Sequence, residues 1–116
     1  DFILANYKKA YLYYQTKLSG YATFQTKTAN SVHNYSYAPI LLENEKQCLG
    51  VKEALESKNI FARRYFYPSL DSLDFIKSPL QSVSRDIASR ILCLPISYQI
   101  TEHEQDTICE IVKGAL

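Results

Sequence analysis

The sequence predicts an α+β fold in which a small sheet of about three to four strands is covered by helices. Three observations indicate this class. With 116 residues, the chain can bury one hydrophobic core but is too short for two ordinary domains. Amphipathic patterns of helical period alternate with short segments rich in branched and aromatic residues. No repeat, low-complexity tract or linker interrupts them, so residues 1–116 are expected to form one domain.

The first predicted element is an amphipathic helix. Tyr7, Tyr11, Tyr14 and Leu18 recur at helical spacing and form one apolar stripe, and Gly20 is expected to close the helix in the left-handed conformation. The following stretch, residues 21–33, is mostly small and polar, which predicts a weak strand and then a loop.

A strand is predicted over Tyr35–Leu42, where aromatic and branched residues are bounded by polar ends. Pro39 cannot donate a backbone hydrogen bond, which indicates an edge strand or a bulge. Asn44 then begins a helix as its N-cap, with Gln47 three residues later, and Asn59 ends it. The expected inward face of this helix consists of Cys48, Val51, Ala54 and Leu55.

A second strand is predicted at Ile60–Tyr67, ending before Pro68, and Ser69–Lys77 has the composition of a surface loop. Ser78 as N-cap, with Pro79 in the first helical position and Gln81 completing the box, predicts a third helix. Its expected buried face consists of Leu80, Val83, Ile87 and Ile91.

The last two predicted elements are a short buried strand and a helix. Leu92–Ile96 is apolar, and Pro95 ends its pairing. Thr101 and Glu104 form a capping box that begins the final helix. Its apolar stripe consists of Ile108, Ile111, Val112 and Ala115.

Composition and charge exclude several classes of protein. Thirteen basic and twelve acidic residues leave a formal charge of +1, so no overall field attracts nucleic acid or an anionic membrane. The longest apolar stretches are far short of the roughly 20 residues that cross a bilayer. Cys48, Cys93 and Cys109 are odd in number and widely spaced, which favours buried reduced thiols and a cytoplasmic location.

The residues offer few sites for catalysis. No Cys, His or carboxylate spacing matches a metal site, and glycine is too scarce for a phosphate-binding loop. The exception is the run from Arg63 to Pro68, RRYFYP, in which two guanidinium groups and three aromatic rings stand at the end of a predicted strand. Arginine can hold a phosphate and an aromatic face can cover a sugar, so this cluster is a candidate ligand site. Spacing alone equally allows packed tyrosines beside solvated arginines.

Three segments, in this order, are similar to a known family: NIFARRYFYP, SPLQSVSRDIASRILCLPIS and ITEHEQDTI. They resemble the carboxy-terminal domain of the DegT/DnrJ/EryC1/StrS family of pyridoxal-phosphate-dependent sugar aminotransferases, and the resemblance covers essentially the whole chain. It implies a parent enzyme that transfers an amino group, commonly from glutamate, to a nucleotide-linked keto-deoxy sugar such as a dTDP-4-keto-6-deoxyhexose.

The resemblance also implies what this chain lacks. In the family a lysine of the large domain holds pyridoxal phosphate (PLP), and none of the nine lysines here stands in such a motif. The chain alone is therefore expected to bind no PLP and to be inactive. Its implied partners are the nucleotide-sugar substrate, the large domain of the same enzyme and a second copy in a homodimer, with no nucleic acid and no membrane. Since the first helix would pack on the large domain, we expect an exposed, self-associating stripe at Tyr7, Tyr11 and Tyr14.

The same resemblance places the segment from Tyr65 to Pro68 toward the sugar nucleotide. Tyr65 and Tyr67 are thus candidate substrate contacts, and Arg63 and Arg64 are candidate phosphate contacts. Tyr65 stands where many members have histidine, which is a departure from the family pattern.

Two other functions fit parts of the sequence. The first is a freestanding α+β domain that senses a small molecule or binds a protein, with the aromatic cluster as its anchor. The second is a nucleic-acid module that stacks bases on the aromatic residues, against which the balanced charge and the missing RNP pattern argue.

Overall fold

Four α-helices and three short strands form the structure, a computed structural model that describes residues 1–116. The elements in chain order are α1 (Phe2–Lys17), β1 (Thr23–Phe24), β2 (Ala38–Leu41), α2 (Glu45–Glu56), the 3₁₀ helix η1 (Leu70–Ser72), α3 (Ser82–Arg90), β3 (Ile91–Leu94) and α4 (Glu102–Gly114). This arrangement confirms the predicted α+β class with a three-stranded antiparallel sheet. None of the helices combines the length and the hydrophobicity that a membrane span requires.

One face of the sheet forms the core with α1, α2 and α4. Alternation along the strands points Ala38 and Ile40 of β2 and Leu92 and Leu94 of β3 into this core. The helices and the C-cap of α1, Leu18, add the other buried residues, which are Tyr11, Tyr14, Leu18, Cys48, Val51, Leu55, Ile108, Cys109 and Val112. No helix of this core covers the opposite face, where Pro39, Leu41 and Ile91 are only half-buried. We call this second side the open face of the sheet.

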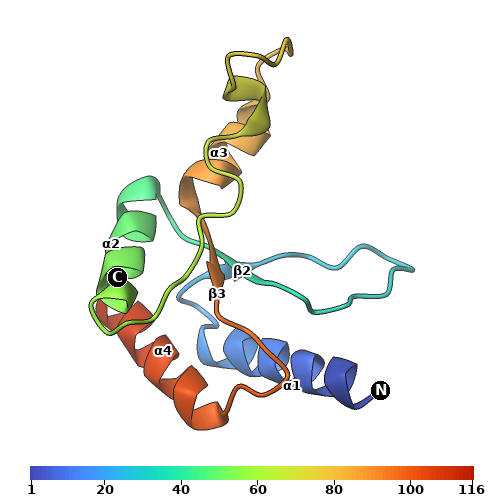
Figure 1. Ribbon diagram of the computed structural model, residues 1–116, viewed down its shortest axis with the longest axis vertical. Coiled ribbons are helices and arrows are strands. Elements are labelled where there is room, and N and C mark those ends of the chain that lie inside the picture. Colours follow the sequence, from blue (N-terminus) through green and yellow to red (C-terminus); the bar gives the residue numbers. More distant parts are fainter.

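The segment 69–90, which contains η1 and α3, extends away from this core in Figure 1. We call it the arm. The structure corrects two predictions here: α3 begins at Ser82 with Gln81 as its N-cap, four residues after Ser78, and its expected buried face is largely outside the core. Leu80 and Val83 are 70% and 74% exposed, and Ile87 and Ile91 are half-buried. α3 contacts α2 and buries Ala88, but Leu80 and Val83, near its beginning, stay outside the core.

The strand predicted at Ile60–Tyr67 is wrong. Only Arg63 pairs with β3, where it exchanges two backbone hydrogen bonds with Cys93 at 3.1 and 2.8 Å. The chain then turns at Tyr65 and Phe66, and Phe66 adopts a left-handed φ of 46°. The aromatic residues that favoured a strand pack on one another and on an arginine, instead of extending the sheet.

Pro39 lies in the central strand, so the prediction of an edge strand was wrong for β2 as a whole. Proline lacks a backbone donor, and at this position in β2 none is required. β1 pairs only with the last two residues of β2 and does not reach Pro39. On its other side Pro39 stands opposite Cys93, whose backbone groups are bonded to Arg63. Neither neighbour therefore requires a donor from Pro39.

The helix ends agree better with the sequence, because their signals are local. Asn44 accepts a hydrogen bond from the backbone N–H of Gln47 at 2.9 Å, and Thr101 and Glu104 form the predicted capping box. Gly20 is left-handed at φ 83°, but it lies beyond the C-cap of α1, which is Leu18. The expected exposed stripe on α1 is wrong: Tyr11 and Tyr14 are buried, because α1 packs on α4 and the sheet within this chain.

Candidate substrate-binding site

Arg63 is the free cationic group of the open face. It stands directly opposite Cys93, and residues paired in this way project to the same side of a sheet. Its side chain is exposed, and no carboxylate lies within ion-pair distance of it. Burial raises the pKa of the Cys93 thiol, so this neighbour adds no negative charge at neutral pH. Arg63 is therefore available to hold an anionic group.

Tyr65 belongs to a cluster of three aromatic side chains beside Arg63. Its ring lies 4.3 Å from that of Phe66 and 5.0 Å from that of Tyr37, measured between centroids. The hydroxyls of Tyr37 and Tyr65 are 3.1 Å apart and form one hydrogen bond. This bond raises the pKa of Tyr65, so its hydroxyl stays protonated at neutral pH. We call Tyr37, Tyr65 and Phe66 the aromatic cluster.

Arg64 faces the other way and is part of the scaffold. Its Nη2 donates to Glu45 Oε2 at the start of α2 and to the carbonyl oxygen of Ser89 at the end of α3, both at 3.0 Å. Its guanidinium carbon lies 3.6 Å from the centroid of the Tyr67 ring. With its side chain only 14% exposed, Arg64 connects two helices and occupies one face of Tyr67.

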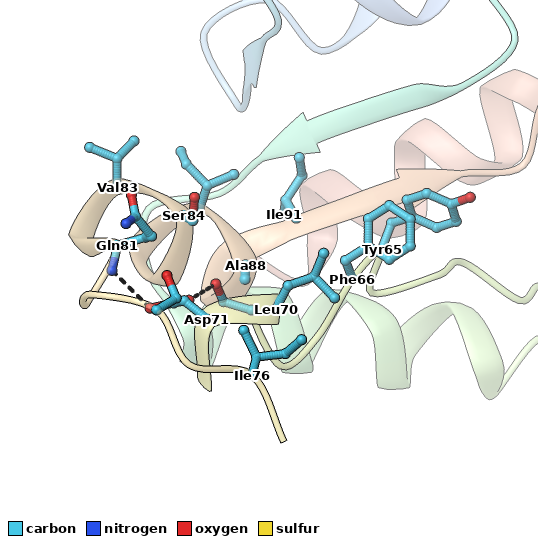
Figure 2. A pocket seen from close by; sticks show the side chains of 13 residues that line it. Tyr65, Phe66, Leu70, Asp71, Ile76, Gln81, Val83, Ser84, Ala88 and Ile91 are labelled. Atoms are coloured by element: carbon cyan, nitrogen blue, oxygen red, sulfur yellow. Dashed lines mark hydrogen bonds between the residues drawn. The ribbon is translucent and has the colours of Figure 1, made fainter. Parts of the chain in front are cut away.

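A mainly apolar cavity of about 520 Å³ begins at Tyr65 and Phe66 and runs along the arm (Figure 2). Figure 2 shows these two rings at one end and Val83 and Gln81 at the other, with Ile91 of β3 between them. Phe66 is 63% exposed, so the entrance of the cavity carries an accessible aromatic face next to the hydroxyls of Tyr37 and Tyr65. The arrangement suits a ligand with both polar and flat apolar parts.

Asp71 holds the arm in the shape that forms this cavity. Its carboxylate accepts hydrogen bonds from the hydroxyl of Ser69, from the backbone N–H of Gln81 at 2.8 Å and from Nε of Arg85 at 2.8 Å. The Arg85 bond, followed by the Gln81 and Ser69 bonds, lowers the pKa of Asp71 far below its usual range. Asp71 thus joins η1 to the beginning of α3.

The structure divides the four candidate residues of the sequence into two pairs. Arg63 and Tyr65 lie near one another, whereas Arg64 and Tyr67 stack on each other. Sequence analysis missed Tyr37, although alternation along its predicted strand puts it on the side opposite Ala38. It also missed the cavity, which no local pattern indicates, because its walls come from the turn, the arm and β3.

The lysines of this chain do not fit a covalent PLP site. All nine are exposed or half-buried, and none lines the cavity beside Tyr65. A lysine that reacts as a free amine at neutral pH needs burial or a neighbouring cation to lower its pKa. The residues present support binding of a ligand, with no candidate for covalent attachment of the cofactor.

Comparison with known proteins shows the family of the chain. Residues 1–113 match the DegT/DnrJ/EryC1/StrS aminotransferase family. The chain belongs to this family. It is 33% identical, over 96% of its length, to dTDP-4-amino-4,6-dideoxy-D-glucose transaminase of Shigella dysenteriae. It is 27% identical, over 75% of its length, to the transaminase of the same name from Escherichia coli.

A solved structure of a family member from Brucella abortus superposes on 97% of the chain with a TM-score of 0.83 and 21% identity. This likeness concerns the fold. The chain spans only a quarter to a third of the proteins it resembles: 34% of the Shigella transaminase, 26% of the Escherichia coli transaminase and 31% of the Brucella chain. The family model shows the family of the chain, whereas the activity of a complete protein is not established by a match to part of it.

Proposed function

We propose that this chain is the C-terminal portion of a PLP-dependent aminotransferase that acts on a nucleotide-linked keto-deoxy sugar. A dTDP-4-keto-6-deoxyhexose, with glutamate as amino donor, is the substrate pair we favour. In this proposal residues 1–116 form a single small domain that supplies one wall of the substrate cleft. The relatives named for dTDP-sugar transamination support the substrate class.

The observation that carries the proposal is the unpaired guanidinium of Arg63 beside the aromatic cluster. A nucleoside diphosphate sugar carries two negative phosphates flanked by a sugar and a flat base. Arg63 suits a phosphate oxygen, since charge-assisted hydrogen bonds from arginine are strong and directional. Tyr65 and Phe66 suit the sugar or the base, because each offers an accessible ring face or a hydroxyl.

Amino-group chemistry is assigned to PLP held outside residues 1–116. PLP supplies the electron sink that transamination requires. Since the lysines here do not fit a covalent PLP site, this chain alone should bind no PLP and should not transfer amino groups. Its contribution is to bind and orient the nucleotide sugar.

Two protein partners belong to the same proposal: the large domain of the enzyme and a second copy in a homodimer. The support is the apolar surface of the arm, where Leu70, Phe75, Leu80 and Val83 are exposed. Leu70 and Val83 also line the cavity. A monomeric soluble protein seldom exposes so many large apolar side chains together.

Calorimetric titration with dTDP tests the proposal in the complete enzyme. Replacing Arg63 by alanine should weaken dTDP binding about ten- to a hundredfold, the loss expected for a charge-assisted hydrogen bond. Lys58→Ala is the matched control, because this substitution also removes one positive charge. Lys58 is exposed and forms no ion pair. Equal affinities for the Arg63→Ala variant and the wild type would reject Arg63 as the phosphate contact.

The alternative is a freestanding domain that senses a small molecule or binds another protein. The exposed apolar arm is the observation that favours it. The two proposals differ in one observable. A reading frame that begins with a start codon just before Asp1 supports the freestanding domain, whereas a frame that continues upstream into a lysine-bearing large domain supports the aminotransferase.

A further inference from the structure

The hydroxyl of Tyr37 adds a second polar group to the proposed site, next to the hydroxyl of Tyr65. Tyr37 precedes β2, whereas Tyr65 lies in the turn after Arg63, so 28 positions of sequence separate the two residues. β3 lies between them, because it pairs with β2 on one side and with Arg63 on the other. The two side chains must therefore reach toward each other across β3 to bring their hydroxyls within 3.1 Å.

Neither phenol is buried deeply enough for packing alone to require this bond. Tyr37 is about half exposed, and the hydrogen bond between the two hydroxyls lies in an exposed position. Between two exposed hydroxyls, water competes on nearly equal terms, so the bond adds little to stability. An exposed pair of hydroxyls beside a free arginine is better placed to meet a ligand than to hold the fold together.

The chemistry of two paired phenols gives the reason. In such a bond one hydroxyl donates its proton and the other accepts, so the accepting hydroxyl keeps its own proton free. A hydroxyl that accepts a hydrogen bond also becomes a better donor, because hydrogen bonds in a chain polarise one another. A phenol has an ordinary pKa near 10 and is neutral at neutral pH, and the pairing raises the pKa of Tyr65 further, so Tyr65 puts no phenolate charge close to Arg63. The pair therefore presents one oriented donor and no anion.

We propose that Tyr37 is a positioning residue, whose hydroxyl pairs with that of Tyr65 so that the one free proton of the pair points to an anionic group of the ligand next to Arg63. The inference rests on the proposed function, from which it takes the diphosphate of the nucleotide sugar as the anionic group. It adds a residue from a different part of the chain and a division of roles: Arg63 supplies charge, and the paired hydroxyls of Tyr37 and Tyr65 supply one oriented donor.

Nucleotide binding by hydroxyl-deletion variants provides the test, in the complete enzyme and with dTDP as the probe. Tyr37→Phe and Tyr65→Phe should each weaken dTDP binding about three- to tenfold, the range for one neutral hydrogen bond. The double variant should bind dTDP about as tightly as the weaker-binding of the two single variants, because either deletion already destroys the pair. Tyr98→Phe is the matched control, since Tyr98 is an exposed tyrosine outside the aromatic cluster.

A second readout does not depend on any ligand. With ¹³C at Cζ of the tyrosines, a pH titration by NMR should show the pKa of Tyr65 falling toward its ordinary value in Tyr37→Phe and staying raised in Tyr98→Phe. If the role of Tyr37 were purely structural, Tyr37→Phe would lower the melting temperature. The fraction of the variant that remains native would then bind dTDP as the wild type does.

The outcomes separate the two proposals. If the wild type binds dTDP and Arg63→Ala weakens it, but Tyr37→Phe binds as the wild type does, the role of Tyr37 is refuted while the proposed function stands. Additive losses in the double variant, or an unchanged Tyr65 titration, refute the coupling of the two hydroxyls. If the wild type does not bind dTDP at all, the proposed function fails and the role of Tyr37 falls with it.

Discussion

Two adjacent arginines show how one position in the sequence changes the role of a side chain. Because Arg63 pairs with β3, its side chain projects to the open face, and the next side chain turns toward the helices. Arg64 there meets Glu45 and the carbonyl of Ser89, and it covers Tyr67. The sequence predicted the cluster but could not separate the two residues, because the partners of Arg64 come from α2 and α3.

The first prediction concerns the stability of Arg64→Ala. The substitution removes two hydrogen bonds and the stacking contact with Tyr67, so we expect the free energy of unfolding to fall by about 1–3 kcal/mol. Urea denaturation followed by circular dichroism measures it. Arg63→Ala is the internal control and should change stability by less than about 0.5 kcal/mol, as is usual for an exposed side chain. Equal losses for the two variants would contradict the division of roles.

Among the elements, those with local signals were predicted well. Asn44, and Thr101 with Glu104, satisfy the first backbone donors of their helices with side chains only a few residues away. In the arm, no nearby side chain caps the start of the helix in this way. Its helix begins where Asp71, ten residues earlier, accepts the N–H of Gln81, so the local box at Ser78 did not locate the start.

The second prediction is that the arm opens more readily when Asp71 loses its charge. Asp71→Asn keeps the size of the side chain but removes the charge that Arg85 pairs with, so amides 81–88 should exchange faster with deuterium. Asp86→Asn is the control, because Asp86 pairs with Arg90 within α3 and makes no bond to η1.

The same contact sets a dependence on pH. The folded-state pKa of Asp71 lies below its unfolded value near 3.8, so its stabilisation is complete above that pH and is lost as the pH falls further. The protection of amides 81–88 from hydrogen exchange should therefore decrease as the pH falls below about 3.8. An arm whose protection is unchanged in Asp71→Asn and in acid would show that Asp71 does not hold it.

At the scale of the whole molecule, the sheet has one face covered by three helices and one face left for the site. The order of motifs along the chain was enough to indicate the family, because those segments include the RRYFYP turn, β3 and the α4 cap. Sequence could not show that Tyr11 and Tyr14 are buried within this chain, nor that Tyr37 meets Tyr65. Both depend on which elements pack together in three dimensions.

We propose that these residues bind the substrate and that the cofactor is attached covalently to polypeptide outside them. Borohydride reduction of the complete enzyme loaded with PLP, followed by peptide mass spectrometry, locates the modified lysine most directly. We expect one stoichiometric adduct, on a lysine outside residues 1–116, and an isolated chain that stays unlabelled. A specific adduct on any of the nine lysines of this chain would contradict the assignment.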